Sequence, residues 1–220
     1  MNAVVHSIGS LFSSGQFPHT SEPDNAPQLY GKPAPDFVLC RDEHGNATAV
    51  YGCAVWDFNA YRLSATKLSR ILFDAVLDES GQEQQALIEE AKYLLYCLIY
   101  FAGGGRIGRL SAGTLNQYWI VLRAAMQFCY EQKKKPMVGV LSLQQLFTVP
   151  VYLAAFIHSN SFDKTSLAGI LRGLARVGEE RLGYASLNPA NFDLTRPEYK
   201  QHPVIPTRIY LNLINLTGDL

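Results

Sequence analysis

The chain has 220 residues, and 48% of them are apolar, which is enough to build the core of one large domain or two small ones. Its 19 basic and 19 acidic side chains cancel to a formal net charge of zero at pH 7. The longest apolar run covers the ten residues 93–102, whereas a membrane-spanning helix needs about 20, and the amino terminus lacks the basic start of a secretory signal. We therefore expect a cytoplasmic protein with no membrane partner.

The charges are unevenly distributed along the chain. Residues 1–61 contain two basic and six acidic side chains, a net charge of −4, whereas residues 103–176 contain nine basic and two acidic ones, a net charge of +7. Phosphate binding is driven by basic side chains and by the counterions that they release from a nucleic acid. The overall neutrality argues against a nucleic-acid partner, but the basic middle of the chain favours one.

The four cysteines lack the C-x-x-C spacing that is typical of zinc and redox sites. We expect reduced, mostly buried thiols and no metal site. Cys40 and Cys53 could face each other across a hairpin, so a disulfide between them is the alternative, although disulfides are rare in cytoplasmic proteins.

Residues 1–35 are rich in Ser, Pro, Asn and Gly and predict a flexible leader, because such a stretch offers little apolar surface to bury. Two β-prone runs follow on either side of His44-Gly45-Asn46, where glycine and asparagine tolerate the positive φ of a tight turn. These runs predict a small β-hairpin over residues 37–56.

From Tyr61 onward the apolar residues recur with helical periodicity. A first helix is predicted to end near Ser80-Gly81, with a stripe of Leu63, Leu68, Ile71, Leu72, Ala75 and Val76. A second helix is predicted to end at the glycines 103–105, with a stripe of Ala86, Leu87, Ala91, Leu94, Leu95, Leu98 and Ile99. The glycines suit a helix end and a loop.

A third helix is predicted to begin after Ser111, a candidate N-cap. Its apolar positions fall within about 100° of arc, which makes it the clearest amphipathic helix of the chain. These positions are Leu115, Tyr118, Trp119, Leu122, Met126 and Cys129. Lys133 to Pro136 end the helix, because basic side chains favour the negative end of the helix dipole and proline cannot continue the hydrogen bonding.

Capping residues also predict the helices that follow. Ser142 caps a short helix that ends at Phe147, Pro150 opens the next one, and Asp163 caps a longer helix. The buried stripe of that last helix is expected to be Leu167, Ile170, Leu171, Leu174 and Val177.

The predicted fold class is mainly α, a helical bundle with a small N-terminal β-hairpin. The expected parts are the leader (1–35), the hairpin plus a helix (36–80), a helical domain (81–182), and a loop with an amphipathic linker helix (183–220).

The stretch GRLSAGTLNQYWIVLRAAMQFCYEQ, residues 108–132, resembles the core-binding, SAM-like domain of phage-integrase-type tyrosine recombinases. In that family a short Ser/Thr-rich cap leads into a helix with an aromatic residue, a Leu-Arg pair and a later aromatic residue, here Thr114, Tyr118, Leu122-Arg123 and Phe128. The carboxyl-terminal stretch HPVIPTRIYLNLINL resembles the linker and first helix through which large integrases enter their catalytic domain. The resemblance covers roughly residues 85–217.

This resemblance implies a C-shaped clamp around duplex DNA, with the helical core-binding module on one face and a catalytic domain on the other. Catalysis in the family needs two arginines, a lysine, a His-x-x-Arg element and a tyrosine nucleophile, all in the domain after the linker. None of the five histidines here is followed three residues later by arginine. We therefore expect no catalytic residue, no metal and no cofactor in this chain, which by itself is not an enzyme.

Candidate DNA contacts on the third helix are Asn116, Arg123 and Gln127. They lie within about 40° of one another, beside the buried stripe, and could meet phosphates or base edges. The alternative is an ordinary solvated face.

On the helix capped by Asp163, Arg172 and Arg176 share the outer face with Thr165. Two arginines at i and i+4 repel each other unless an anion lies between them, which favours a phosphate partner.

The other basic candidates have simpler alternative explanations. Arg106 and Arg109 lie in the glycine-rich loop and could either approach a DNA backbone or remain solvated. The lysines 133–135 could contact DNA, but the alternative is that they only stabilise the end of a helix. Glycines 103–105 lack the lysine of a phosphate loop, so no nucleotide site is predicted. The aromatic residues on helical faces are expected in the core: Tyr93, Tyr96, Tyr100, Trp119 and Phe156. The full set of predicted DNA-binding residues is Arg106, Arg109, Thr114, Asn116, Arg123, Gln127, Lys133, Lys134, Lys135, Lys164, Thr165, Arg172 and Arg176.

The sequence thus predicts duplex DNA binding by the front part of a recombinase from a mobile element, with self-association on DNA as a further possibility. A helical protein-interaction module, or an inactive truncated integrase that no longer binds DNA, is the first alternative. A small enzyme is the second, but no convergent set of polar residues supports it.

Overall fold

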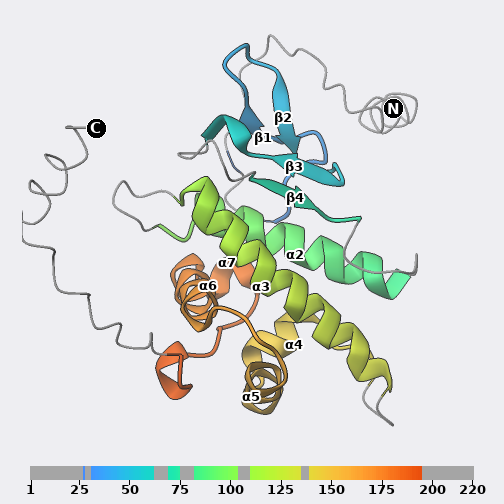
Figure 1. The fold of residues 1–220 in the computed structure, drawn as a ribbon, viewed down its shortest axis with the longest axis vertical. Helices are drawn as coiled ribbons and strands as arrows, with labels where there is room; N and C mark the ends of the chain where they lie inside the picture. The colour runs from blue at the N-terminus through green and yellow to red at the C-terminus, as the bar shows by residue number, and fades with distance from the viewer. Residues whose placement is uncertain are drawn as a thin grey trace, which may run out of the picture.

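The computed structural model describes residues 27, 31–61, 69–74, 82–103, 110–134 and 139–194. Figure 1 shows a group of packed helices with a small antiparallel sheet on one side of it. The predicted fold class, mainly α with a small N-terminal β-element, is confirmed. The linker helix predicted after residue 205 lies outside the described residues, as does most of the predicted leader.

The predicted hairpin consists of strands β1 (Val38–Arg41) and β2 (Ala47–Val50), which pair antiparallel. The carboxylate of Asp42 closes the turn by accepting a hydrogen bond from the backbone N–H of Asn46 at 2.8 Å, and Gly45 adopts a φ of 81°. Pro35, which the sequence assigned to the leader, contacts the end of this hairpin, because its carbonyl oxygen accepts the backbone N–H of Gly52, just after β2.

Two further strands extend the sheet. Strand β3 (Val55–Asp57) pairs with β2, and β4 (Arg70–Leu72) pairs with β3, so the strand order within the described residues is β1-β2-β3-β4. The first predicted helix, expected from about Tyr61 to near Ser80-Gly81, is therefore wrong at its centre. Its flanks, residues 62–68 and 75–81, lie outside the described part of the chain.

Residues 70–72 form a strand and not the predicted helix, because pairing and burial there alternate with a period of two residues. Ile71 is 1% exposed and lies opposite Trp56, whereas Leu72 is 43% exposed. Arg70 also points outward and forms an ion pair with Asp57 across the strands, with 3.0 Å between Nε and Oδ2. None of these partners is a sequence neighbour of β4, so helical periodicity alone could not reveal the strand.

The helices begin where the capping residues predict. Their bounds are α2 Gln82–Tyr100, α3 Ala112–Glu131, α4 Leu143–Thr148, α5 Pro150–Ser159, α6 Lys164–Val177 and α7 Glu179–Leu182, with 3-10 turns η1 Asn59–Tyr61, η2 Gln132–Lys134 and η3 Pro189–Asn191. Ser111, Ser142 and Asp163 accept backbone N–H groups of the first turns of α3, α4 and α6, as predicted. The short helix α7 was not predicted.

One hydrophobic core joins the sheet to the helices. The ring of Phe73, next to β4, packs edge-on against Trp56 at 4.8 Å and against Trp119 of α3 at 4.9 Å between ring centroids. Tyr96, Trp119 and Phe156 are at most 6% exposed, so the prediction that they belong to the core is confirmed. The two other aromatic residues predicted there, both on α2, are partly buried against it.

All four cysteines are buried, and their thiols are free. The prediction of reduced, buried cysteines is confirmed, and the alternative disulfide between Cys40 and Cys53 is not formed. Burial raises the pKa of both thiols to about 11, which keeps them protonated and poorly nucleophilic at neutral pH.

Candidate nucleic-acid interface

Helix α6 presents an apolar face to the core and a basic face to solvent. Its leucines and isoleucine at 167, 170, 171 and 174 are fully buried, as predicted, whereas Arg172 and Arg176 are exposed. The two arginines lie one turn apart, so their guanidinium groups can serve the same ligand.

The start of α6 is fixed by the carboxylate of Asp163. It accepts the backbone N–H groups of Thr165 at 3.2 Å and Ser166 at 3.1 Å, and the hydroxyls of both residues also donate to it. These hydrogen bonds, led by that from the Ser166 side chain, lower the pKa of Asp163. The hydroxyl hydrogen of Thr165 is therefore engaged in the helix cap, and its predicted contact with DNA stays a prediction. Lys164, by contrast, is exposed.

Tyr118 of α3 contacts α6 at Gly169, which lies on the same side of α6 as the two arginines. A Cβ added to Gly169 would lie only 2.5 Å from the Tyr118 hydroxyl oxygen, so the helices meet where a side chain is missing. Burial raises the pKa of Tyr118, and the charges of Arg172 and Arg176 act in the opposite direction. The structure thus brings the two arginines and the Tyr118 hydroxyl into one neighbourhood.

Arg176 reaches back to the loop that precedes α3. Its Nη1 donates to the carbonyl oxygen of Gly103 at 3.1 Å, and Gly103 adopts a φ of 56° at the end of α2. Within the described residues, neither Arg176 nor Arg172 forms an ion pair with an acid. Arg106 and Arg109 belong to the same loop but lie outside the described residues.

The predicted stripe on α3 faces elsewhere. Asn116, Arg123 and Gln127 lie roughly 140–180° around the helix from Tyr118, which contacts α6. Arg123 and Gln127 are exposed, and Asn116 is half-buried. The structure therefore does not place this stripe and the basic face of α6 on one side of α3.

The lysines after α3 lie at its far end. Helix α3 has 20 residues, which makes it about 30 Å long, and Lys133 lies two positions after its last residue, Glu131. The Lys133 ammonium contacts the carboxylate of Glu83 at 2.6 Å and lies 5.7 Å from the centroid of the Tyr130 ring. Lys133, one of the basic residues of segment 103–176, therefore does not lie beside the arginines of α6. Lys134 is exposed beside it, and Lys135 lies outside the described residues.

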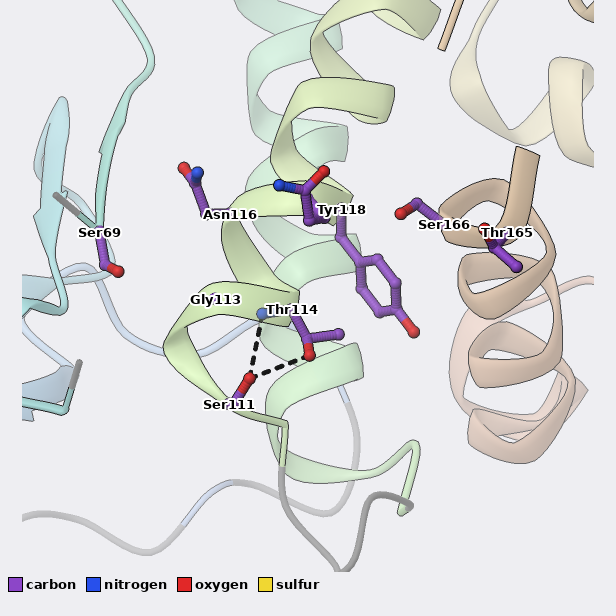
Figure 2. A pocket seen from close by; sticks show the side chains of 9 residues that line it. Ser69, Ser111, Gly113, Thr114, Asn116, Tyr118, Thr165 and Ser166 are labelled. Carbon is purple, nitrogen blue, oxygen red and sulfur yellow. Dashed lines mark hydrogen bonds between the residues drawn. The ribbon is translucent and has the colours of Figure 1, made fainter. Parts of the chain in front are cut away.

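A shallow cavity of about 470 Å³ lies at the amino-terminal end of α3. Figure 2 shows Tyr118 extending from α3 toward α6, where Thr165 and Ser166 face it, while Ser69 approaches the first turn of α3 from the sheet side. The Thr114 hydroxyl, a predicted DNA contact, lies 3.0 Å from the Ser111 hydroxyl inside this cavity. The lining residues carry hydroxyl and amide groups but no charged side chain.

Six of the nine lining residues were not predicted to form part of a site: Ser69, Ser111, Gly113, Gln117, Tyr118 and Ser166. Tyr118 was assigned to the buried stripe, and Ser69 fell within a predicted helix. Gly169 did give a usable signal, because a glycine inside a helical pattern usually marks close packing.

Comparison with known proteins gives no match to a protein family, to a curated protein or to a solved structure. Among the described residues, no group of three His, Cys, Asp or Glu side chains could hold a metal ion. No helix in the described part of the chain is both long and apolar enough to cross a membrane.

Proposed function

We propose that this chain binds duplex DNA through the outer face of α6, as the core-binding module of an integrase-like site-specific recombinase of a mobile element. The resemblance of residues 108–132 to the core-binding domain supports the proposed family. The exposed basic face of α6 supports the proposed binding of DNA. Under this proposal the chain acts in the cytoplasm and holds DNA for a strand exchange that another domain catalyses. It has no catalytic residue of its own.

The observation that carries this proposal is the pair Arg172 and Arg176. Both side chains are exposed on adjacent turns, and the acids nearest in sequence, Glu179 and Glu180, form no ion pair with them within the described structure. Like charges at i and i+4 destabilise a helix unless an anion lies between them. Phosphodiester groups are such anions, and the planar guanidinium binds them through two parallel hydrogen bonds.

The surroundings of the pair favour a backbone contact over base readout. The partners close to the arginines are the Tyr118 hydroxyl and the Gly103 carbonyl, which belong to a helix flank and a loop and not to a protruding recognition helix. Contacts to phosphates fix a protein on a duplex without reading its sequence. We therefore assign Arg172 and Arg176 to phosphate binding, with Lys164 at the start of the same helix as the next contact.

The salt dependence of binding tests this proposal. The affinity for duplex DNA should fall as the salt concentration rises. On a plot of the logarithm of the affinity against the logarithm of the salt concentration, two phosphate contacts should give a negative slope with a magnitude of about 1.8 or more. Fluorescence anisotropy of the full chain with a labelled duplex measures this slope. No binding even at low salt, or binding insensitive to salt, would contradict the proposal.

A helical protein-interaction module is the second candidate, and helix α5 favours it. This helix is apolar on nearly all sides, yet Val151 is 66% exposed and only Leu153 and Phe156 are buried. Apolar surface of this kind is typical of a contact with another protein. Sedimentation at several salt concentrations, with and without DNA, separates the two candidates. An apolar association between protein chains strengthens or stays constant as salt rises, whereas DNA binding weakens.

A further inference from the structure

The cavity at the start of α3 is lined by a buried serine, Ser69, whose hydroxyl has no partner in the described part of the chain. Ser69 is 6% exposed, and its backbone is held by two hydrogen bonds, from its N–H to the side chain of Asn59 at 2.9 Å and from the N–H of Phe58 to its carbonyl at 2.8 Å. Its hydroxyl forms no hydrogen bond with any described residue. In Figure 2 this hydroxyl is directed toward the first turn of α3.

Buried polar groups in proteins are almost always hydrogen-bonded to protein, to water or to a ligand. Ser69 is a buried residue whose hydroxyl lines this cavity without a partner among the described residues, so a ligand in the cavity could supply the missing hydrogen bond.

The helix supplies donors to the same cavity. The Ser111 hydroxyl accepts the N–H of Thr114, and the Ser111 carbonyl accepts the N–H of Leu115, which leaves the N–H groups of Ala112 and Gly113 without an acceptor in the described residues. Gly113 has no side chain to cover its N–H, and a Cβ built there would meet nothing closer than the Ser111 hydroxyl at 3.8 Å. The first turn of a helix of 20 residues also carries a positive partial charge.

We propose that this cavity binds a phosphate group, held by the Ser69 hydroxyl, the Gly113 N–H and the side-chain amide of Asn116. A phosphate oxygen accepts several hydrogen bonds at once, and neutral donors at a helix amino terminus are a common phosphate site. The lining contains no carboxylate that would repel an anion. The phosphate belongs either to a DNA backbone, which rests on the proposed function, or to a small phosphorylated molecule.

The test is a titration of the full chain with inorganic phosphate, followed through the amide resonance of Gly113 by NMR, with sodium chloride at equal ionic strength as the ion control. We expect a saturable shift with phosphate and none with chloride. Ser69→Ala should weaken phosphate binding about tenfold, because it removes a hydrogen bond to a charged group. Ser161→Ala, the same deletion at an exposed position outside the cavity, should leave the binding unchanged.

A second variant guards against a trivial loss of folding. Gly113→Ala should raise the thermal stability, because alanine is a better helix former and the position is open, yet it should weaken phosphate binding by covering the N–H. No saturable shift in the wild type, or identical phosphate binding by wild type and Ser69→Ala, would overturn the proposal.

The same variants distinguish the two sources of phosphate. If the phosphate is part of DNA, Ser69→Ala weakens duplex binding as well; if only inorganic phosphate responds, the ligand is a small phosphorylated molecule. Phosphate binding without any affinity for DNA would remove the proposed function and leave this site intact.

Discussion

The hydroxyl of Tyr118 lies so close to the backbone of Gly169 that a single added methyl group would come within 2.5 Å of it. This contact sets the approach of α3 to α6, and with it the position of the two arginines relative to the loop at Gly103. It also makes Gly169 a residue whose side chain is excluded by packing and not by backbone conformation, since it lies within a regular helix.

The first prediction concerns this contact. Gly169→Ala should lower the free energy of unfolding by about 1–3 kcal/mol, because the strain of overpacking exceeds the gain of about 1 kcal/mol in helix propensity. Adding Tyr118→Phe removes the closest atom and should recover part of the loss. Chemical denaturation of the two single variants and the double variant measures this coupling; additive effects would show that the two residues do not meet as described.

A second prediction concerns the carboxylate of Glu90 on α2, which accepts the backbone N–H of Leu143 at 2.5 Å and so caps α4 from 53 residues away. Burial raises the pKa of Glu90, although hydrogen bonds from the backbone N–H groups of Leu143 and Gln144 act against the rise. The folded state therefore binds this proton more tightly than the unfolded state does, and the stability of the protein falls as pH rises through the unfolded and then the folded pKa.

Glu90→Gln should remove that dependence. The unfolding free energy of the wild type relative to Glu90→Gln should decrease as pH rises through the unfolded pKa of glutamate, near 4.5, and then through the higher folded pKa, as measured by denaturation at several pH values. Glu131→Gln, at an exposed position of α3, is the control. An increase over the same interval would mean that hydrogen bonding, and not burial, dominates at Glu90.

A third prediction concerns the cap of α6. Asp163→Ala should cost about 1 kcal/mol of stability at neutral pH, whereas Asp163→Ser, which retains an acceptor, should cost less. Because hydrogen bonding lowers the pKa of Asp163, its stabilisation is present above the unfolded pKa, near 3.8, and is lost as pH falls through the lower folded value. Thermal unfolding of the three proteins at neutral and acidic pH checks both statements; a loss that persists unchanged in acid would contradict the assigned cause.

These caps explain why much of the fold was predictable from the sequence. Ser111, Ser142 and Asp163 each hydrogen-bond within three residues of themselves, so the chemistry that starts α3, α4 and α6 is local and visible in the sequence. Strand β4 could not be predicted in this way, because it pairs with β3, which lies well before it in the sequence. Ile71, for example, lies opposite Trp56.

The candidate site was predictable only in part, for the same reason. The arginines of α6 could be found from their spacing opposite a leucine stripe. Their grouping with Tyr118, and the separation of Arg123 from them, depends on how α3 crosses α6, which no local pattern encodes. The ion pair of Lys133 with Glu83 likewise joins residues 50 positions apart.

A fourth prediction follows from that ion pair. Lys133→Ala should leave the affinity for duplex DNA unchanged within about twofold, because Lys133 is paired with Glu83 at the end of α3 remote from α6, and exposed pairs contribute little to stability, on the order of 0–1 kcal/mol. Binding measurements on Lys133→Ala and Glu83→Gln check this; a loss of DNA affinity in Lys133→Ala comparable to that of an α6 variant would extend the interface along the whole of α3.

The most direct test of the account is the DNA affinity of Arg172→Ala/Arg176→Ala, measured over a range of salt and compared with Arg123→Ala. We expect that the double variant keeps its fold, that its affinity falls about tenfold or more, and that the slope against salt decreases in magnitude by about two, whereas Arg123→Ala changes neither. Equal affinity and equal slope in the wild type and the double variant would show that the α6 face does not hold DNA.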